Sequence, residues 1–150
     1  MPETSSSQLR TRLWEAANIL RGSAVDRTDW KGYILPLLFF KRISDVWDEE
    51  TAEATEIYGE ANPALFPEIH RFHVPEGCHW RNTRETAANV GTALARAMQE
   101  IERANPDTLY RVFGAADWGN REKFTDELLK DLIEGFSAIP LGNNAVSADC

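Results

Sequence analysis

WKGYILPLLFFKRISD, residues 30–45, is the most apolar part of this chain, and it ends in the basic pair Lys41-Arg42. Within it, the eight residues Tyr33–Phe40 offer no polar face. A helix that is apolar all round is normally buried between neighbouring elements. The stretch is too short to cross a bilayer, which takes about 20 apolar residues. We therefore expect it to form the buried part of a central helix.

The predicted central helix extends well beyond this stretch. Asp26 or Thr28 can cap its start, because a short side-chain oxygen accepts hydrogen bonds from the free amides of a first turn. The helical pattern continues from about Asp29 to Tyr58, and Gly59 is placed to end it. Pro36 lies inside the helix, where its ring and its missing amide predict a kink or a break.

The two ends of the chain carry amphipathic helix patterns that can cover this centre. One helix should run from Ser6 or Ser7 to Arg21, and Gly22 is placed to end it. Its apolar stripe, widened by Trp14, consists of Leu9, Leu13, Ala16, Ala17 and Leu20. The last helix should follow a Thr125 cap, and its stripe consists of Leu128, Leu129, Leu132, Ile133 and Phe136.

Two further helices are predicted between these ends. Asn82, with Glu85 three residues on, has capping-box chemistry and should start a helix that runs to about Arg103. Asn105-Pro106 should restart the helix as far as Gly114, because proline fits the first helical position. The apolar stripe before this restart consists of Val90, Leu94, Ala97, Met98 and Ile101.

The remaining segments complete an all-α architecture. Three prolines and a glycine interrupt the pattern over residues 61–82, which predicts an irregular insert with a short extended segment around Phe72–Val74. We expect a bundle of five to seven helices, in which the first, fourth and last helices surround the central one. The domain should span residues 6–140, after a loose leader at 1–5 and before a linker that starts at 141–150.

Charge is unevenly distributed along this acidic chain. The net charge is −8, which argues against a surface that binds nucleic acid over its whole extent. Residues 8–42 nevertheless carry seven basic and three acidic side chains, whereas residues 43–60 carry seven acidic side chains and no basic one. The basic front can contact phosphate locally, and the alternative is an ordinary solvated surface. The acidic second half of the central helix, residues 45–60, should project into solvent.

The sequence carries no recognisable catalytic motif. It lacks a glycine-rich phosphate loop, a Gly-x-Ser-x-Gly elbow and a protease-like Cys-His pair, and FGAADWG at 113–119 is too weak for a nucleotide loop. The paired carboxylates at 48–50 and 126–127 fit solvated helix faces, and the tryptophans fit core positions better than base-stacking ones. We therefore assign no catalytic and no cofactor-binding residue.

A cluster of histidines and one cysteine is the best metal candidate. It consists of His70, His73, Cys78 and His79. Zinc needs about four converging ligands, and adjacent residues rarely bind one ion together, so we assign no metal ligand. The cluster is better explained as polar loop residues that flank Phe72 and Trp80. With only Cys78 and Cys150, and with no signal peptide at the start, the chain is predicted to be cytoplasmic without a disulfide framework.

Residues 13–50, LWEAANILRGSAVDRTDWKGYILPLLFFKRISDVWDEE, closely resemble the start of the modification (HsdM) subunit of type I restriction–modification systems. That family opens with a tryptophan-containing helix, an LRG-like stop, a YIL-x-LLFLKRISD helix and an acidic tail. The resemblance continues in FHVPEGCHWRNT, NVGTALARAMQEIERANPDTLYRVF and LLKDLIEGFSAIPL, and it covers about residues 8–149 in the family's order.

The resemblance implies a non-catalytic role for this segment. In the family, a following domain binds S-adenosylmethionine and methylates the amino nitrogen of an extruded adenine. Its Phe-x-Gly-x-Gly loop and its Asn-Pro-Pro-aromatic loop are absent here, where Asn62-Pro63 and Asn105-Pro106 lack the second proline and the aromatic residue. An end at Cys150 therefore suggests a fragment of a longer subunit that is a DNA adenine-N6 methyltransferase.

The resemblance also implies partners and a DNA-facing surface. The helical domain should help to assemble two modification subunits with a specificity subunit and to close the complex around DNA, with the restriction subunit as a further partner. The DNA-facing candidates are Arg21, Arg27, Lys31, Lys41 and Arg42. As an alternative, the pair Lys41-Arg42 can form ion pairs with acids of its own helix.

Two other function classes stay open at this point. The chain can be a free-standing helical adaptor that binds another protein through the stripe Leu128–Phe136, or a metal-binding regulator built on His70, His73 and His79.

Overall fold

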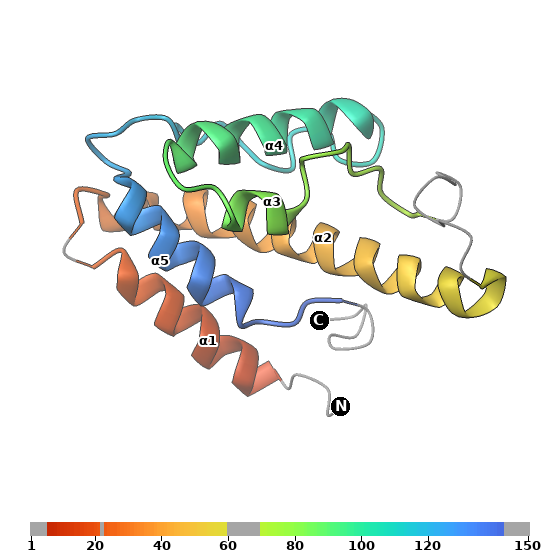
Figure 1. Cartoon of the computed structure of the whole chain (residues 1–150). Coiled ribbons are helices and arrows are strands. Elements are labelled where there is room, and N and C mark those ends of the chain that lie inside the picture. The colour runs from red at the N-terminus through yellow and green to blue at the C-terminus, as the bar shows by residue number, and fades with distance from the viewer. Residues whose placement is uncertain (1–5, 22, 60–69, 143–150) are drawn as a thin grey trace.

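The computed structural model describes residues 6–21, 23–59 and 70–142, and this part of the chain is all-helical without a strand (Figure 1). The predicted all-α class is therefore confirmed. In chain order the elements are α1 (Ser6–Ile19), the short 3-10 helix η1 (Arg27–Asp29), α2 (Trp30–Tyr58), α3 (Trp80–Arg84), α4 (Val90–Ala104) and α5 (Asp126–Ser137).

The predicted bounds of the long helix α2 are confirmed to within one residue. Asp26 caps the η1 turn that leads into it, and the Asp26 carboxylate accepts the Thr28 amide at 2.9 Å. Pro36 does not break α2, which continues as one helix on both sides of it. Gly59 ends α2 at a φ of 75°, a conformation that glycine adopts without the usual steric cost.

α5 contacts each of the other α-helices of the described chain. It packs against α1, α2, α3 and α4. In Figure 1, α1 and α5 lie side by side, and α3 lies between α2 and α4. The expectation that residues 33–40 would be enclosed on every side is wrong, because Phe39 remains 37% exposed.

Aromatic side chains join the apolar half of α2 to helix α3 and to an irregular segment of the chain. The Tyr33 ring meets Trp118 and Phe124 edge-on, at centroid distances of 5.4 and 4.7 Å. Phe40 is fully buried and meets the Trp80 ring edge-on at 5.2 Å. Such pairs contribute about 0.5–1.5 kcal/mol each beyond the area that they bury. The apolar run therefore packs against the short helix α3 and against the irregular segment 113–124.

α1 is shorter and its apolar stripe narrower than predicted. The helix ends at Ile19, two residues before Arg21, and the predicted stop at Gly22 lies outside the described residues. Ala16 and Leu20 are buried as expected, but Trp14 is 57% exposed. Trp14 therefore does not widen the buried stripe, and its ring instead lies 5.8 Å from the Arg21 guanidinium.

The helix predicted from Asn82 to Arg103 is two helices, α3 and α4. His79, not Asn82, caps α3, and the Asn82 side chain accepts the His79 amide from inside the helix. Asn89, with a φ of 56°, separates α3 from α4. The predicted stripe from Val90 to Ile101 is confirmed, since its members are buried on α4.

The helix predicted from Asn105 to Gly114 does not form. Residues 105–115 are a series of turns, and Arg111 and Gly114 have φ values of 55° and 66°, which a right-handed helix cannot contain. The Asn105 side chain holds the earlier insert instead, because it accepts the His73 amide at 2.8 Å and donates to the His73 carbonyl at 2.8 Å.

The remaining predictions for the insert and for α5 have mixed outcomes. The described part of the insert, residues 70–79, is irregular as predicted and contains no strand, and residues 61–69 lie outside the described chain. The extended segment at Phe72–Val74 did not require a strand and stays a prediction. The Thr125 cap is confirmed, since its hydroxyl accepts the Leu128 amide at 3.1 Å.

Candidate functional site

The N-terminal end of α2 presents the basic side chains of the predicted front. Thr28 binds the Asp26 carboxylate through its amide and its hydroxyl, and these hydrogen bonds lower the pKa of Asp26. The Trp30 indole donates to the Val25 carbonyl at 3.3 Å and fixes the turn against α2. Arg27 and Lys31 are thereby held exposed on η1 and on the first turn of α2.

The five DNA-facing candidates fall into two different environments. Arg21, Arg27 and Lys31 are exposed. Lys41 is only 6% exposed, and the Arg42 guanidinium donates to the Leu141 carbonyl at 2.6 Å. Lys41 forms an ion pair with Asp45 of its own helix at 2.5 Å, the alternative that the sequence left open. The structure therefore leaves the first three on the surface and uses the last two inside the fold.

Lys41, Arg42 and Asp45 of α2 hold residues 139–141, and we call this set the C-terminal clasp. The Lys41 ammonium donates to the Ile139 carbonyl at 2.9 Å, and the Asp45 carboxylate accepts the Leu141 amide at 2.9 Å. Beyond the clasp, a Cβ on Gly142 would lie 1.7 Å from Oε1 of Glu49. The segment after α5 is therefore fixed closely along α2 by hydrogen bonds between residues almost 100 positions apart.

The histidine and cysteine cluster serves packing and capping. The His70 ring stacks on Trp47 at 4.6 Å, and its Nε2 lies 2.7 Å from the Thr51 hydroxyl. Burial raises the pKa of the Cys78 thiol, so this group is a neutral thiol at neutral pH and not a ready metal ligand. Within the described residues, no group of three or more His, Cys, Asp or Glu side chains is placed to hold a metal ion.

His79 links α3 to the acidic half of α2. Its Nδ1 accepts the Arg81 amide at 2.9 Å, so in this arrangement Nε2 carries the proton and donates to Asp48 at 2.9 Å. These groups border a polar pocket of about 570 Å³. Two charge pairs border the pocket, since Lys41 meets Asp45 and Arg84 binds Glu134 through Nε at 2.8 Å and Nη2 at 2.9 Å.

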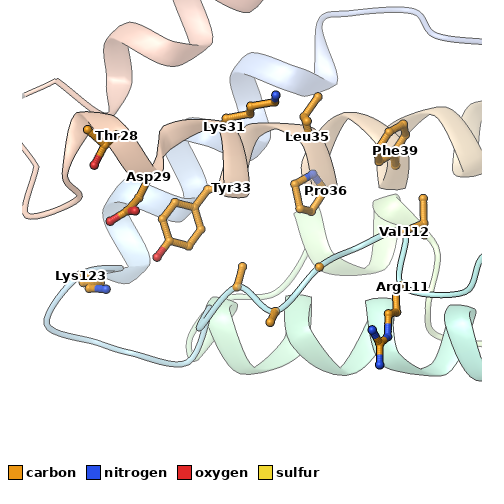
Figure 2. Close-up of a pocket in the computed structure, with 14 residues that line it drawn as sticks. Thr28, Asp29, Lys31, Tyr33, Leu35, Pro36, Phe39, Arg111, Val112 and Lys123 are labelled. Carbon is orange, nitrogen blue, oxygen red and sulfur yellow. The ribbon is translucent and has the colours of Figure 1, made fainter.

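A larger groove of about 740 Å³ lies between the first half of α2 and residues 111–116 (Figure 2). Figure 2 shows Pro36 directed from α2 toward the segment that continues from Arg111 and Val112, and Tyr33 directed toward the side on which Lys123 lies. Leu35 and Phe39 add apolar surface along the α2 wall. The charged side chains that line the groove are Lys31, Arg111, Lys123 and Asp29.

One end of this groove is fixed by a charged network. The Tyr33 hydroxyl donates to Asp117 at 2.9 Å, and the Lys123 ammonium lies 3.6 Å from the same carboxylate. Burial, followed by the Asp117 contact, raises the pKa of Tyr33, whereas the Tyr33 hydrogen bond lowers the pKa of Asp117. The Asp117 charge raises the pKa of Lys123. At neutral pH the groove therefore ends in a neutral phenol and a charged ammonium.

The carboxylates and tryptophans are used more specifically than the sequence suggests. The sequence pattern places Asp126 on a solvated face, but its carboxylate accepts the Asn89 and Val90 amides at 3.1 and 3.0 Å and so caps the start of α4. Trp80 and Trp118 are buried as predicted. No local pattern could reveal the Asp126 contact, because its partners lie 36 and 37 positions away.

The stripe considered for an adaptor function is already occupied. Leu129, Leu132, Ile133 and Phe136 are each at most 2% exposed and belong to the core cluster of the described chain. A partner protein can bind this face only if the bundle opens. The stripe is therefore part of the fold and not a free docking surface.

Comparison with protein families identifies the family of the chain. The family model described as HsdM N-terminal domain matches residues 9–136. The chain belongs to the HsdM N-terminal domain family. The resemblance noted in the sequence is thus confirmed, and the match runs from α1 to the last turn of α5. No curated protein matches the chain.

As an HsdM N-terminal domain, the chain is of a type that belongs to methyltransferase subunits of type I restriction–modification systems. The carbonyls that the C-terminal clasp holds, at Ile139 and Leu141, lie just beyond the matched residues. None of the described helices is both long enough and apolar enough to cross a membrane.

Proposed function

We propose that this chain is the non-catalytic N-terminal arm of a type I modification subunit, and that it joins the specificity subunit and helps to close the complex around DNA. The family match over residues 9–136 carries this proposal. The parent subunit would use S-adenosylmethionine to methylate the amino nitrogen of adenine. That chemistry needs the cofactor and catalytic loops of a further domain, and this sequence contains neither.

The DNA-facing part of the proposal rests on Arg21, Arg27 and Lys31. All three are exposed, and they flank the turn between α1 and α2. The whole chain has a net charge of −8, whereas residues 8–42 carry more basic than acidic side chains. Phosphate would therefore be attracted more strongly to this end of the molecule than to the rest of its surface. Lys41 and Arg42 are not included, because their hydrogen bonds hold residues 139–141.

Charge reversal in the complete complex tests this role. We expect Arg21→Glu, Arg27→Glu and Lys31→Glu together to weaken DNA binding and to reduce the dependence of log K on log salt by about 0.9 for each phosphate that is no longer bound. The matched control reverses three exposed arginines of other segments, Arg71, Arg96 and Arg103. Equal DNA affinity and salt dependence in the two triple variants, which carry the same change in charge, would contradict the DNA-facing role.

Assembly is tested separately from DNA binding. Native mass spectrometry of the modification subunit mixed with its specificity subunit should give a complex with two modification subunits, for the native protein and for both triple variants. A modification subunit that carries this domain but never joins a specificity subunit would contradict the assembly role. The isolated chain is expected to show neither cofactor binding nor methyl transfer.

A further inference from the structure

The groove between α2 and residues 111–116 combines an apolar floor with a cationic rim. Pro36 and Val112 lie on opposite walls, and Phe39 is 37% exposed at one end of the α2 wall. Phe39 lies beside Leu35 on the same wall, so an apolar side chain that enters the groove would remove apolar surface from water. The floor therefore favours an apolar side chain as the group that enters the groove.

The rim selects the charge of the partner. Lys31, Arg111 and Lys123 line the groove, and Asp29 is the single acid among the lining residues of this pocket. Asp117 already faces Lys123. The Arg111 guanidinium lies 5.1 Å from the Tyr110 ring, and neither Arg111 nor Lys31 forms an ion pair with another described residue, so these two cations can still meet an incoming carboxylate. The chain as a whole carries a charge of −8, so an acidic partner is repelled by most of the surface and attracted here.

We propose that this groove docks a short segment of a partner protein in which an apolar side chain is flanked by carboxylates. The apolar side chain would cover Phe39 and Val112, and the carboxylates would reach Lys31 and Arg111. A nucleic acid is the poorer match, because a phosphate backbone gains nothing from covering this apolar floor. The inference is drawn from the groove itself and does not depend on the proposed role in a type I complex.

The probe is a short fluorescent peptide with a central Leu-Phe pair flanked by glutamates, titrated into the full 150-residue chain. Its matched peptides carry glutamine in place of glutamate, or serine in place of the Leu-Phe pair. We expect each replacement to weaken binding by about tenfold, and we expect binding of the acidic peptide to weaken as salt rises. Binding that is equal for the three peptides, or absent for the acidic one, would overturn the proposal.

Variants of the chain locate the binding site. Arg111→Glu and Phe39→Ser should each weaken binding of the acidic peptide by about tenfold. The controls Arg96→Glu and Ile57→Ser change the same classes of exposed side chain outside the groove and should leave the affinity unchanged. Circular dichroism checks that each variant is folded, and Arg111→Gln provides a milder change. Unchanged affinity in folded groove variants would refute docking at this site.

Two competing occupants are tested in the same series. Sedimentation of the chain across a range of concentrations tests self-association, and a dimer that Phe39→Ser dissolves would assign the groove to a second copy and refute the proposal. Titration of duplex DNA into the complete complex tests whether nucleic acid occupies the groove. A loss of DNA affinity in Arg111→Glu, without a loss of peptide affinity, would equally refute it.

Discussion

Lys41 and Ile139 are 98 positions apart in the sequence, yet the Lys41 ammonium donates a 2.9 Å hydrogen bond to the Ile139 carbonyl. The same ammonium pairs with Asp45, whose carboxylate also accepts the Leu141 amide. A buried cation is tolerated only when it is paired and hydrogen-bonded, and the clasp meets both conditions. Lys41 is thus one of the three α2 residues that hold residues 139–141 after α5.

Replacing Lys41 tests the energetic value of this clasp. Lys41→Met keeps the aliphatic length but leaves the Ile139 carbonyl and part of the Asp45 carboxylate without their partner. We expect the free energy of unfolding to fall by about 1–3 kcal/mol in urea titrations. Lys31→Met, at an exposed lysine of the same helix, should change it by less than about 0.5 kcal/mol. Equal unfolding midpoints for Lys41→Met and the native chain would show that the Lys41 contacts of the clasp contribute no stability.

Gly91 allows a close approach between α4 and the chain near Trp118. A Cβ at this position would lie 1.9 Å from the Trp118 carbonyl oxygen, which is backbone and cannot rotate away. Gly91→Ala should therefore destabilise the fold by about 1–3 kcal/mol in thermal or urea unfolding.

The matched control for Gly91 is Gly32 of α2, around which a Cβ would meet nothing within 4 Å. Gly32→Ala should raise the free energy of unfolding by about 0.5–1 kcal/mol, because alanine loses less backbone entropy in a helix. A stabilising Gly91→Ala would show that α4 does not approach Trp118 as closely as described.

Asn105 fastens the insert to the end of α4. Its side chain is 6% exposed, binds the His73 amide and carbonyl, and donates to the Ile101 carbonyl at 2.7 Å. Asn105→Ala should lower the free energy of unfolding by about 1–3 kcal/mol and raise amide exchange at His73. Asn18→Ala, on the exposed face of α1, is the control. If the His73 amide of Asn105→Ala exchanged as slowly as in the native chain, Asn105 would not hold the insert.

Asp126 gives the fold a defined sensitivity to acid. The Val90 and Asn89 amides lower its pKa in the folded state, so its contribution to stability is present above the unfolded-state value of about 4. That contribution is lost as the pH falls below about 4 through the lowered folded-state pKa. Asp126→Asn should remove this part of the acid dependence when urea unfolding is compared at about pH 6 and below about pH 4. The same acid dependence in both proteins would contradict the assignment.

Features set by neighbouring residues could be predicted from the sequence. The α2 bounds, the Thr125 cap and the α4 stripe follow from spacing and capping within one or two helical turns. Family membership was equally visible, because it is carried by long runs of residues in order.

Features set by distant residues could not be predicted. Lys41 resembles a surface lysine until Ile139 is placed beside it, and Asn105 resembles a helix cap until His73 takes its side chain. Trp14 fits the α1 stripe by spacing, but no described neighbour covers it enough to bury it. The groove joins α2 to residues 111–116, where the sequence pattern predicts a helix as far as Gly114, so its walls could not be anticipated.

An HsdM N-terminal domain that only supplies binding surface should perform no reaction by itself. Transfer of a labelled methyl group from S-adenosylmethionine to duplex DNA, measured for the isolated chain and for the complete modification complex, tests this directly. We expect no transfer by the isolated chain and adenine methylation by the complete complex. Methyl transfer by the isolated chain, or a complete complex that leaves adenine unmodified, would show that the proposed role is wrong.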